Sequence, residues 1–487
     1  MLFRLRKVCR ICQELRRLTL ATLAGALMLF ISCTVGPDYV RPKAEVPAAY
    51  KEIEGWKKAQ PGDDAIKGKW WEIFNDPELN SLEEEVDISN QNVAVAEAQF
   101  RQALAAVRVA RSGYFPTVTA DASFTRARLP VGTGRASISG DTTSVFLLTG
   151  AATWEPDLWG KIRRTVEAAE AGAQVNEADL KAVRLSIQAT LAQDYFQLRS
   201  LDAQKRLLNE TVIAYQKSLE LTKNRYASGI ASKADVLLAD TQLKTTQAQA
   251  IDVGVQRSQT EHAIALLIGK PASSFSSPVA PLTAAPPPIP VGVPSELLER
   301  RPDIAAAERL VASANAQIGV AEAAYYPTLT LTASGGFEGS RLSNWLSWPN
   351  RLWSIGSAIA QTVFDAGLRR ALTDEARAAY DATVASYRQT VLTAFQEVED
   401  NLAALRVLEE EARVQEEAVN ASRKLLEVTI NQYKAGTVSY LTVIVVQAAE
   451  LNNESAAVNI LGRRMIASAL LIKALGGGWN ASSVRGG

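Results

Sequence analysis

Two short segments of the chain alternate between apolar and polar residues, and each begins directly after an aromatic pair and a proline. Their apolar positions are Val118, Ala120, Ala122 and Phe124 in the first segment and Leu329, Leu331 and Ala333 in the second. A period of two is typical of a strand that exposes two different faces. A second strand is expected after each, over Ser144–Glu155 and Trp353–Phe364, with glycine- and serine-bearing loops between.

Long stretches without helix-breaking residues follow the strands. Leu158–Tyr226 holds no proline and only two glycines, and Leu368–Tyr433 holds neither. With a rise of about 1.5 Å per residue, each could form a helix on the order of 100 Å long. The chain then returns in helices expected over Ser232–Ile268 and Ser439–Leu475. The pattern therefore predicts two very long helical hairpins, which indicate a tube or a rod rather than a globular core.

Each hairpin is expected to turn at the sequence Tyr-x-x-Gly. These turns run from Tyr226 to Gly229 and from Tyr433 to Gly436. Glycine readily adopts the left-handed backbone conformation that ends a helix. A shorter helix is expected before the first strand, where Asp76 caps its start and Pro77 occupies the first turn, and it is expected to run to about residue 113.

The same order of elements occurs twice. Tyr114-Phe115-Pro116-Thr117 matches Tyr325-Tyr326-Pro327-Thr328, and three further pairs of motifs follow at a nearly constant offset. The chain is therefore predicted to be an internal duplication. The expected organisation is a signal peptide over residues 1–32, an extended tether over 33–75, a first repeat over 76–275, a proline-rich linker over 276–294, a second repeat over 295–476 and a tail over 477–487.

The N-terminus has the pattern of a bacterial lipoprotein signal. Basic residues precede an apolar run, Leu18–Ser32, which is shorter than the roughly 20 residues that span a bilayer. Ser32 then stands before Cys33, and the other two cysteines, Cys9 and Cys12, lie within the signal. Cys33 is therefore the expected site of lipid attachment. Ordinary cleavage without a lipid stays open as the alternative.

Four strands fit a membrane or a soluble hairpin equally well by pattern alone. Aromatic residues favour the membrane, because rings at both strand ends would sit at the two bilayer interfaces; these are Tyr114, Phe115, Tyr325 and Tyr326 at one end and Trp345, Trp348 and Trp353 at the other. They could instead fill the join between helices and strands. No stretch after the signal reaches about 18 apolar residues, so strands rather than a helix are expected to cross the bilayer. About eight strands are needed to close a barrel, so several chains must pool theirs.

Composition argues against other classes of function. Lysine plus arginine equal aspartate plus glutamate at 52 each, which argues against a nucleic-acid partner. The single histidine, His262, has no second histidine or cysteine to complete a metal site, and a packing role is expected for it. We expect no metal, no cofactor and no catalytic residue, so the protein is not expected to be an enzyme.

Several motifs resemble those of TolC-like outer membrane factors. They are the segment from Cys33 to Pro42, the segment from Trp70 to Leu79, the segment from Pro294 to Ile304 and the ending Leu475-Gly476-Gly477-Gly478-Trp479. The resemblance covers essentially the whole mature chain and is strongest to the NodT-type lipoproteins of pumps driven by resistance-nodulation-division transporters. It implies a mainly α protein with a transmembrane β part, in which long helical hairpins form a periplasmic α-barrel and four strands per chain complete a trimeric twelve-stranded β-barrel.

The same resemblance implies a function and partners. The protein would be the exit duct of a tripartite efflux pump in the outer membrane of a Gram-negative bacterium. It would be a homotrimer held in outer-membrane lipid, joined by a periplasmic adaptor (membrane fusion) protein to an inner-membrane transporter of the resistance-nodulation-division class. A lipid-anchored periplasmic coiled-coil spacer and a channel for type I protein secretion remain alternatives.

The resemblance also places a periplasmic gate just past the Tyr-x-x-Gly turns. By motif, Tyr440, Leu441 and Val445 fall there, with Leu441 as the apolar constriction. Asp235 and Asp240, on the equivalent turn of the first half, are the nearest candidates for charges at the periplasmic tip. Solvated charges at a helix end are the alternative for both.

Overall fold

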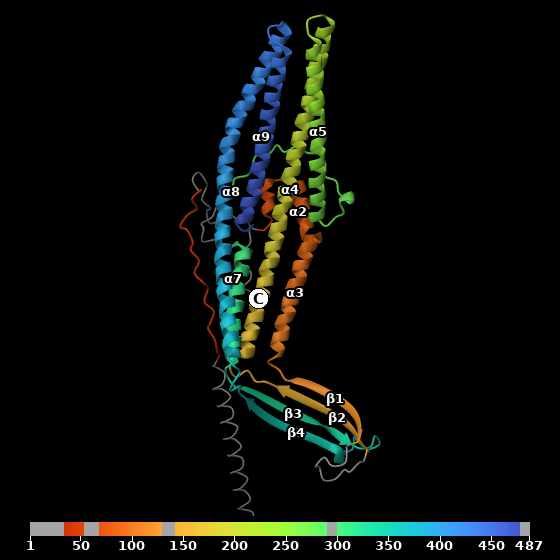
Figure 1. The fold of residues 1–487 in the computed structure, drawn as a ribbon, viewed down its shortest axis with the longest axis vertical. Helices are drawn as coiled ribbons and strands as arrows, with labels where there is room; N and C mark the ends of the chain where they lie inside the picture. Colours follow the sequence, from red (N-terminus) through yellow and green to blue (C-terminus); the bar gives the residue numbers. More distant parts are fainter. Residues whose placement is uncertain (1–33, 53–67, 129–141, 290–299, 478–487) are drawn as a thin grey trace, which may run out of the picture. The chain divides into compact units, whose positions relative to one another are not determined.

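The computed structural model describes residues 34–52, 68–128, 142–289 and 300–477 (Figure 1). The predicted signal peptide, Cys33, the centre of the tether and nearly all of the C-terminal tail lie outside these residues. The chain divides into two compact units. We call them the sheet unit (Met1–Pro42, Arg101–Ala173 and Glu308–Ala385) and the hairpin unit (Lys43–Phe100, Gln174–Ala307 and Ser386–Gly487).

The order of elements repeats in the two halves of the chain. The first half contains the helices α2 (Pro77–Ser89) and α3 (Gln91–Ser112), the strands β1 (Thr117–Arg128) and β2 (Thr142–Trp154), and the helices α4 (Lys161–Ala227) and α5 (Lys233–Leu267). The second half contains α7 (Pro302–Ala323), β3 (Thr328–Gly339), β4 (Arg351–Ala360), α8 (Leu368–Ala435) and α9 (Tyr440–Ala474). Short 3-10 helices occur at η3 (Trp70–Phe74), η4 (Ala272–Ser274) and η6 (Trp348–Asn350). The predicted strands and long helices are therefore confirmed within a few residues.

The helix before the first strand differs from the expectation because it breaks at Asn90. The Asn90 Oδ1 atom accepts hydrogen bonds from the backbone N–H groups of Asn92 at 2.8 Å and Val93 at 3.1 Å, so this side chain caps the start of α3. Its Nδ2 atom donates to the carbonyl of Leu267 at 2.6 Å, which ties the break to the end of α5. At the start of α2, Asp76 is the N-cap as expected and accepts from the N–H groups of Glu78 and Leu79.

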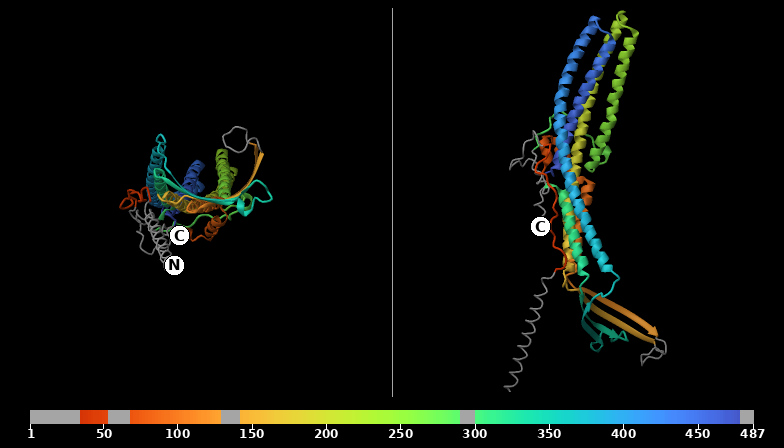
Figure 2. Two further views of the ribbon diagram at one scale, coloured as in Figure 1. Left: turned by 90° about the horizontal axis from the view of Figure 1, so that it is seen from below. Right: turned by 60° about the vertical axis from the view of Figure 1, so that its left-hand side comes forward.

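The four strands form one antiparallel sheet in the order β1-β2-β3-β4 (Figure 1). Neighbouring strands pair without interruption, from Thr117 opposite Thr153 to Arg128 opposite Thr142 in the first hairpin. The central pairing joins the two repeats, with Trp154 of β2 opposite Leu331 of β3. The sheet is curved along its strands (Figure 2). One chain therefore supplies a four-stranded curved sheet with two edges.

Aromatic rings form the core of the hairpin unit beside α2. Trp70 and Phe74 of η3 are buried, and the ring of Phe74 lies 4.8 Å from that of Phe196 on α4. Tyr195 lies next to Phe196 and donates to the Asp76 carboxylate at 2.5 Å. These rings fix η3 and α2 against α4, because aromatic pairs add to the stabilisation from burial alone.

Helix α9 is, among the described residues, the one helix that is long and apolar enough to cross a bilayer by length and composition. The sequence pattern had predicted no such helix after the signal. Tyr440 and Val443 near its start are buried in a cluster with Tyr215 and Leu219 of α4. Its apolar residues are therefore used, at least here, to pack helices against one another.

Candidate functional site

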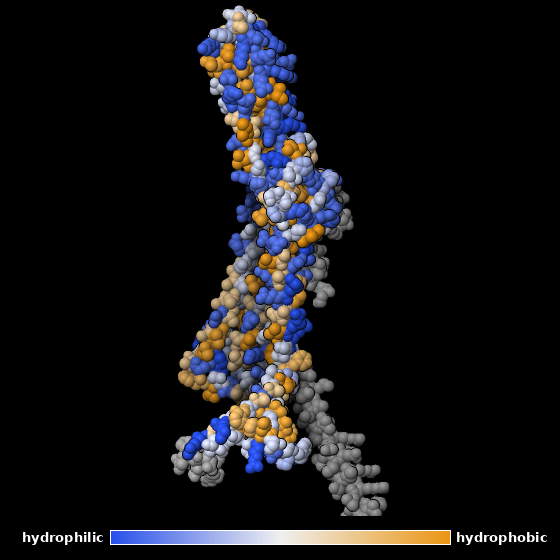
Figure 3. All heavy atoms as spheres, turned by 90° about the vertical axis from the view of Figure 1, so that its right-hand side faces the viewer, coloured by the Kyte–Doolittle hydropathy of each residue, from blue (hydrophilic) through white to orange (hydrophobic). Residues whose placement is uncertain are grey.

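The strand register separates the sheet into one apolar and one polar face. Residues directly opposite each other in an antiparallel sheet project from the same face, and successive residues project from opposite faces. The apolar face carries Val118, Ala120, Ala122 and Phe124 of β1, Phe146, Leu148, Gly150, Ala152 and Trp154 of β2, Leu329, Leu331, Ala333, Gly335 and Phe337 of β3, and Trp353, Ile355, Ser357 and Ile359 of β4. Figure 3 shows hydrophobic surface over the sheet, in the lower part of the view.

The other face carries mostly threonine, serine and small residues. Thr119, Ser334 and Ser354 lie in one row across the sheet, and the hydroxyl oxygens of Ser334 and Ser354 are 2.9 Å apart. Asp121 and Glu338 project from this face as well. Such a surface is suited to contact with water.

The apolar face is exposed in the single chain. Val118 is 73% exposed, Trp353 72% and Ile355 79%. A soluble hairpin would cover these side chains, because a contiguous exposed apolar patch of this kind marks an interaction or membrane surface. Lipid on one face and water on the other is the arrangement of a transmembrane barrel strand. Of the two interpretations that the sequence left open, the structure therefore favours the membrane.

Aromatic residues lie at both ends of the sheet, as expected for the interfaces of a bilayer. At the end beside the helices, the Trp154 Nε1 atom donates to the carbonyl of Tyr114 at 3.0 Å, and the rings of Trp159 and Tyr326 stack at 4.9 Å. At the other end, the rings of Phe124 and Phe146 are 4.6 Å apart. The first group also joins strands to helices, which is the alternative role that the sequence left open for it.

The N-terminal segment is docked onto the sheet unit by Arg164, which sequence reasoning missed. The Arg164 side chain is only 4% exposed, and its guanidinium lies 2.9 Å from the Asp38 carboxylate. It also donates to the carbonyls of Val35 at 3.2 Å and Gly36 at 3.1 Å. Gly36 has a φ of +95°, and a Cβ at this position would lie 2.4 Å from the backbone of Gly319 on α7. The residues directly after Cys33 are therefore held close to the first turn of α4.

Both predicted helix turns are present and lie in the hairpin unit. Gly229 and Gly436 adopt φ values of +74° and +81°, which end α4 and α8. Asp235 forms a capping box with Ser232 at the start of α5, in which each residue's side chain accepts from the other's backbone N–H. Asp240 lies one turn further along α5 and is half-buried. The structure thus gives Asp235 a local capping role.

The residues of the predicted gate lie on two faces of α9. Tyr440 is buried, and its hydroxyl lies 3.0 Å from that of Ser218 on α4. Burial raises the pKa of Tyr440. Leu441 and Val445 are 57% and 62% exposed and are four residues apart, so they share the opposite, open face of the helix.

Contacts beside the two turns connect the hairpins. The Arg225 Nη1 atom donates to the carbonyl of Lys434 at 2.9 Å, and the guanidinium lies 4.7 Å from the centre of the Tyr433 ring. The rings of Tyr433 and Tyr440 are 5.3 Å apart. We call Arg225, Ser218, Tyr433 and Tyr440 the tip contacts.

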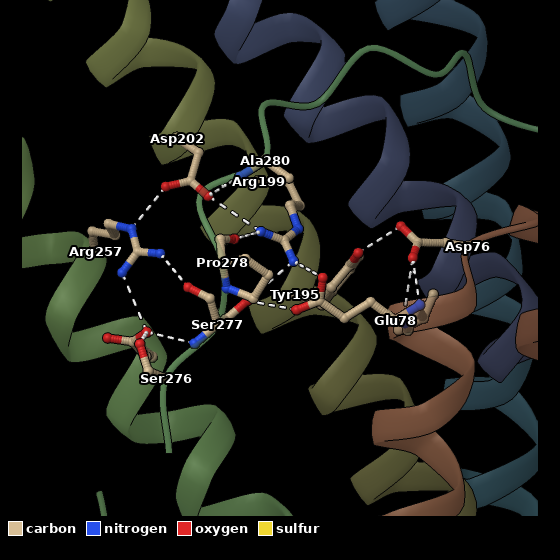
Figure 4. Close-up of polar contacts among 12 residues, drawn as sticks. Asp76, Glu78, Tyr195, Arg199, Asp202, Arg257, Ser276, Ser277, Pro278 and Ala280 are labelled. Atoms are coloured by element: carbon tan, nitrogen blue, oxygen red, sulfur yellow. Dashed lines mark hydrogen bonds and ion pairs between the residues drawn. The ribbon is translucent and has the colours of Figure 1, made fainter. Parts of the chain in front are cut away.

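A buried ionic network fixes the start of the proline-rich linker (Figure 4). Asp202 is fully buried and accepts from Arg257 at 2.7 Å, from Arg199 at 3.3 Å and from the backbone N–H of Ala280 at 3.1 Å. Arg199 also donates to the Pro278 carbonyl at 2.6 Å. The linker therefore begins as a segment bound to α4 and α5.

The described residues contain no group of three or more histidine, cysteine, aspartate or glutamate side chains that could hold a metal ion. His262 is exposed on α5 in the single chain, so the packing role expected for it is not seen there. The candidate site consists of the apolar face of the sheet, its two edge strands and the tip contacts between the helical hairpins.

Comparison with known proteins gives a family and a fold. The sequence model of the family described as "Outer membrane efflux protein" matches residues 83–270 and 293–477. The toluene efflux pump outer membrane protein TtgC of Pseudomonas putida is 30% identical over 95% of this chain and 96% of that protein. The structure of the outer-membrane channel OprN matches with a TM-score of 0.85 and 31% identity, over 92% of this chain and all of that one. The open state of the Neisseria gonorrhoeae outer membrane channel MtrE matches with a TM-score of 0.80 and 26% identity, over 92% and 99%.

Proposed function

The chain belongs to the outer membrane efflux protein family, and from this premise we propose that three copies form one gated duct through the outer membrane. The observation that carries this proposal is the exposed apolar face of a sheet with only four strands. Its edge strands β1 and β4 would leave backbone groups unpaired in lipid, and that is not tolerated. Three copies supply the twelve strands that close a barrel without an edge.

The duct conducts small molecules outward and catalyses no reaction. The relative TtgC is named for the efflux of toluene, and this supports apolar compounds of low molecular mass as cargo. An adaptor protein in the periplasm and an inner-membrane transporter of the resistance-nodulation-division class complete the pump. A coiled-coil spacer has no need of an exposed apolar face on the sheet, and protein secretion finds no support among the named relatives.

Leu441 and Val445 narrow the duct near the hairpin turns. Their shared open face on α9 would place three copies of each side chain around the axis of a trimer. Opening then requires α8 and α9 to move relative to α4 and α5, because the tip contacts join these two pairs of helices. We assign Tyr440 to the tip contacts, which hold the duct closed, and not to the wall of the duct, since its side chain is buried. Asp235 and Asp240 supply negative charge near the entrance.

Cys33 carries the lipid anchor. The docked segment from Thr34 to Asp38 places the residue after Cys33 beside Gly160, between the end of β2 and the start of α4. An acyl chain attached here reaches the periplasmic leaflet at the level where the strands begin.

Purified full-length protein tests the proposal. An oligomer that resists SDS until heated, together with single-channel conductance in planar bilayers, is the expected result. A monomer without conductance, extracted as a peripheral lipoprotein, would overturn it. Deleting the gene should raise susceptibility to solvents and antibiotics, and a chain with Cys33→Ser separates the contribution of the anchor from that of the channel.

A further inference from the structure

Three arginines project from the apolar face of the sheet at the end far from the helices of the sheet unit. Arg126 and Arg128 are the last residues of β1 on the face that carries Phe124, because they follow it at even spacing. Arg351 begins β4 opposite Phe337, which places it on the same face. All three are exposed. A lipid-facing surface that is apolar along the strands therefore ends in positive charge.

The position of these arginines is that of a bilayer interface. Aromatic rings lie at the same end of the sheet: the ring centres of Phe146 and Trp345 are 6.0 Å apart, and the Arg351 guanidinium lies 4.4 Å from the centre of the Trp348 ring. The Arg351 Nη1 atom also donates to the Trp348 carbonyl at 3.1 Å, which holds the guanidinium at the rim. Aromatic residues and arginines gather at the headgroup level of membranes.

No carboxylate neutralises the three arginines in the part of the chain that the structure describes. Asp121 and Glu338, the acidic residues of the strands, project from the opposite face. Among the described residues of the sheet unit, ion pairs are formed by the arginines Arg111, Arg164, Arg309, Arg369, Arg370 and Arg377, and not by these three. Positive charge at the headgroup level favours an anionic lipid, and the planar guanidinium matches a phosphate in a two-point contact.

The three arginines lie on the two opposite edges of the sheet. Arg126 and Arg128 lie on the free edge strand β1, and Arg351 lies on the other edge strand, β4. In the proposed trimer, β4 of one copy pairs with β1 of the next, so each of the three seams carries all three arginines at its outer rim. This step rests on the proposed function.

We propose that Arg126, Arg128 and Arg351 bind the phosphate groups of the outer-leaflet glycolipid, lipopolysaccharide, at each seam between protomers. The helices lie in the periplasm, so the end of the sheet away from them faces the outer leaflet, where this phosphorylated lipid resides. A bound glycolipid bridges two chains at the position where each sheet would otherwise end.

Native mass spectrometry of the purified trimer with bisphosphorylated lipid A tests the site. We expect up to three lipid A molecules per trimer, and at least tenfold weaker binding after R126Q, R128Q and R351Q are combined. A control that removes the same charge from exposed helical positions, R108Q with R206Q and R370Q, should bind as the unchanged protein does. The lysine variants R126K, R128K and R351K keep the charge but lose the two-point contact, and they should bind at an intermediate level.

Three results would overturn the proposal. They are equal lipid A binding by the glutamine variant and the unchanged protein, equal binding of dephosphorylated lipid A, and equal binding of phosphatidylglycerol in place of lipid A. If each seam is one site built from both strands, R351Q alone and R126Q with R128Q should each lower the affinity for lipid A at every seam. If β1 and β4 instead formed separate sites, each variant would only reduce the number of lipid A molecules bound per trimer. Conductance separates failure of the lipid site from failure of the proposed function. A conducting trimer that does not bind lipid A rules out only this site, whereas an unchanged protein that is monomeric rules out the proposed function as well.

Discussion

Glu83 is enclosed within the hairpin unit, and neither of its carboxylate oxygens has a hydrogen-bond partner among the described residues. Burial raises the pKa of this carboxyl well above its usual value, and the nearby charge of Asp87 raises it further. A carboxyl whose pKa is higher in the folded than in the unfolded state favours folding below its unfolded pKa of about 4.3. That contribution is lost as the pH rises through the folded pKa.

The substitution Glu83→Gln should therefore stabilise the protein at alkaline pH and have little effect near pH 4. Gln keeps the shape of the side chain but has no charge to bury, and the gain should be about 1–3 kcal/mol per protomer at high pH. Thermal denaturation between pH 4 and pH 9 measures the effect. Glu84→Gln, at the exposed neighbouring position, is the matched control. A melting temperature that responds equally to both changes would contradict the assignment.

Neutralising Asp202 should destabilise the protein, in contrast to Glu83, because the buried Asp202 carboxylate is paired with two arginines. Asp202→Asn would leave Arg199 and Arg257 without the charge that they share, and breaking a buried pair of this kind costs about 3–5 kcal/mol. We expect a lower melting temperature and faster proteolysis in the linker that begins near Pro278. Asp252→Asn removes the same charge from an exposed position on α5 and should leave both measurements unchanged.

At the scale of elements, local sequence signals were sufficient to predict the helices and strands. They were insufficient to predict the contacts between elements that lie far apart in the chain. The Tyr-x-x-Gly turns and the alternating strand after Pro116 are each determined by residues a few positions apart, so both can be predicted from the sequence. Asn90 breaks a helix that looked continuous, since its cap depends partly on Leu267, far along the chain. Arg199 and Arg164 likewise act on residues far from them in sequence. No spacing rule connects such partners before the chain has folded.

The tip contacts can be tested as a latch between the two hairpins. Arg225→Ala removes the bond to the Lys434 carbonyl and the contact with the Tyr433 ring, and Tyr440→Phe removes the bond to Ser218. Together they should increase single-channel conductance severalfold, because closed-state contacts are lost while Leu441 and Val445 stay in place. Lys217→Ala, an exposed change on α4, should leave the conductance unchanged.

A second measurement distinguishes an open duct from a damaged one. Cells that carry the double variant should become sensitive to large antibiotics that do not cross an intact outer membrane, while the oligomer still resists SDS. Unchanged conductance in an intact oligomer would show that these contacts do not hold the channel closed.

At the scale of the whole molecule, two features of the sequence anticipated the architecture. The duplication gave the repeated order of elements, and the count of four strands required closure by other chains. The sequence did not determine whether the strands face lipid or belong to a soluble hairpin, because the residues at the strand ends fit both environments. The register decides between them, since it aligns all the aromatic side chains of the four strands and most of the bulky aliphatic ones on one face, and only Val145, Leu147 and Leu352 project from the other.

Adjacent residues of β4 test this orientation. Ile355 projects from the lipid face and Ser354 from the face that lines the duct. Ile355→Lys places a charge in the hydrocarbon, at a cost of about 2–4 kcal/mol for each chain near the middle of the bilayer. Three chains multiply the penalty, so SDS-resistant oligomer in the outer membrane should fall sharply.

Ser354→Lys adds the same side chain one residue away, and it should assemble normally because water solvates the ammonium group. Three added positive charges inside the duct should shift the ion selectivity of the channel toward anions, which the reversal potential across a salt gradient measures. Both variants add one lysine to the same strand at nearly the same depth, so the direction of the added side chain is the main difference between them. If Ile355→Lys assembles and changes selectivity while Ser354→Lys fails to assemble, the two faces of the sheet have been assigned in reverse.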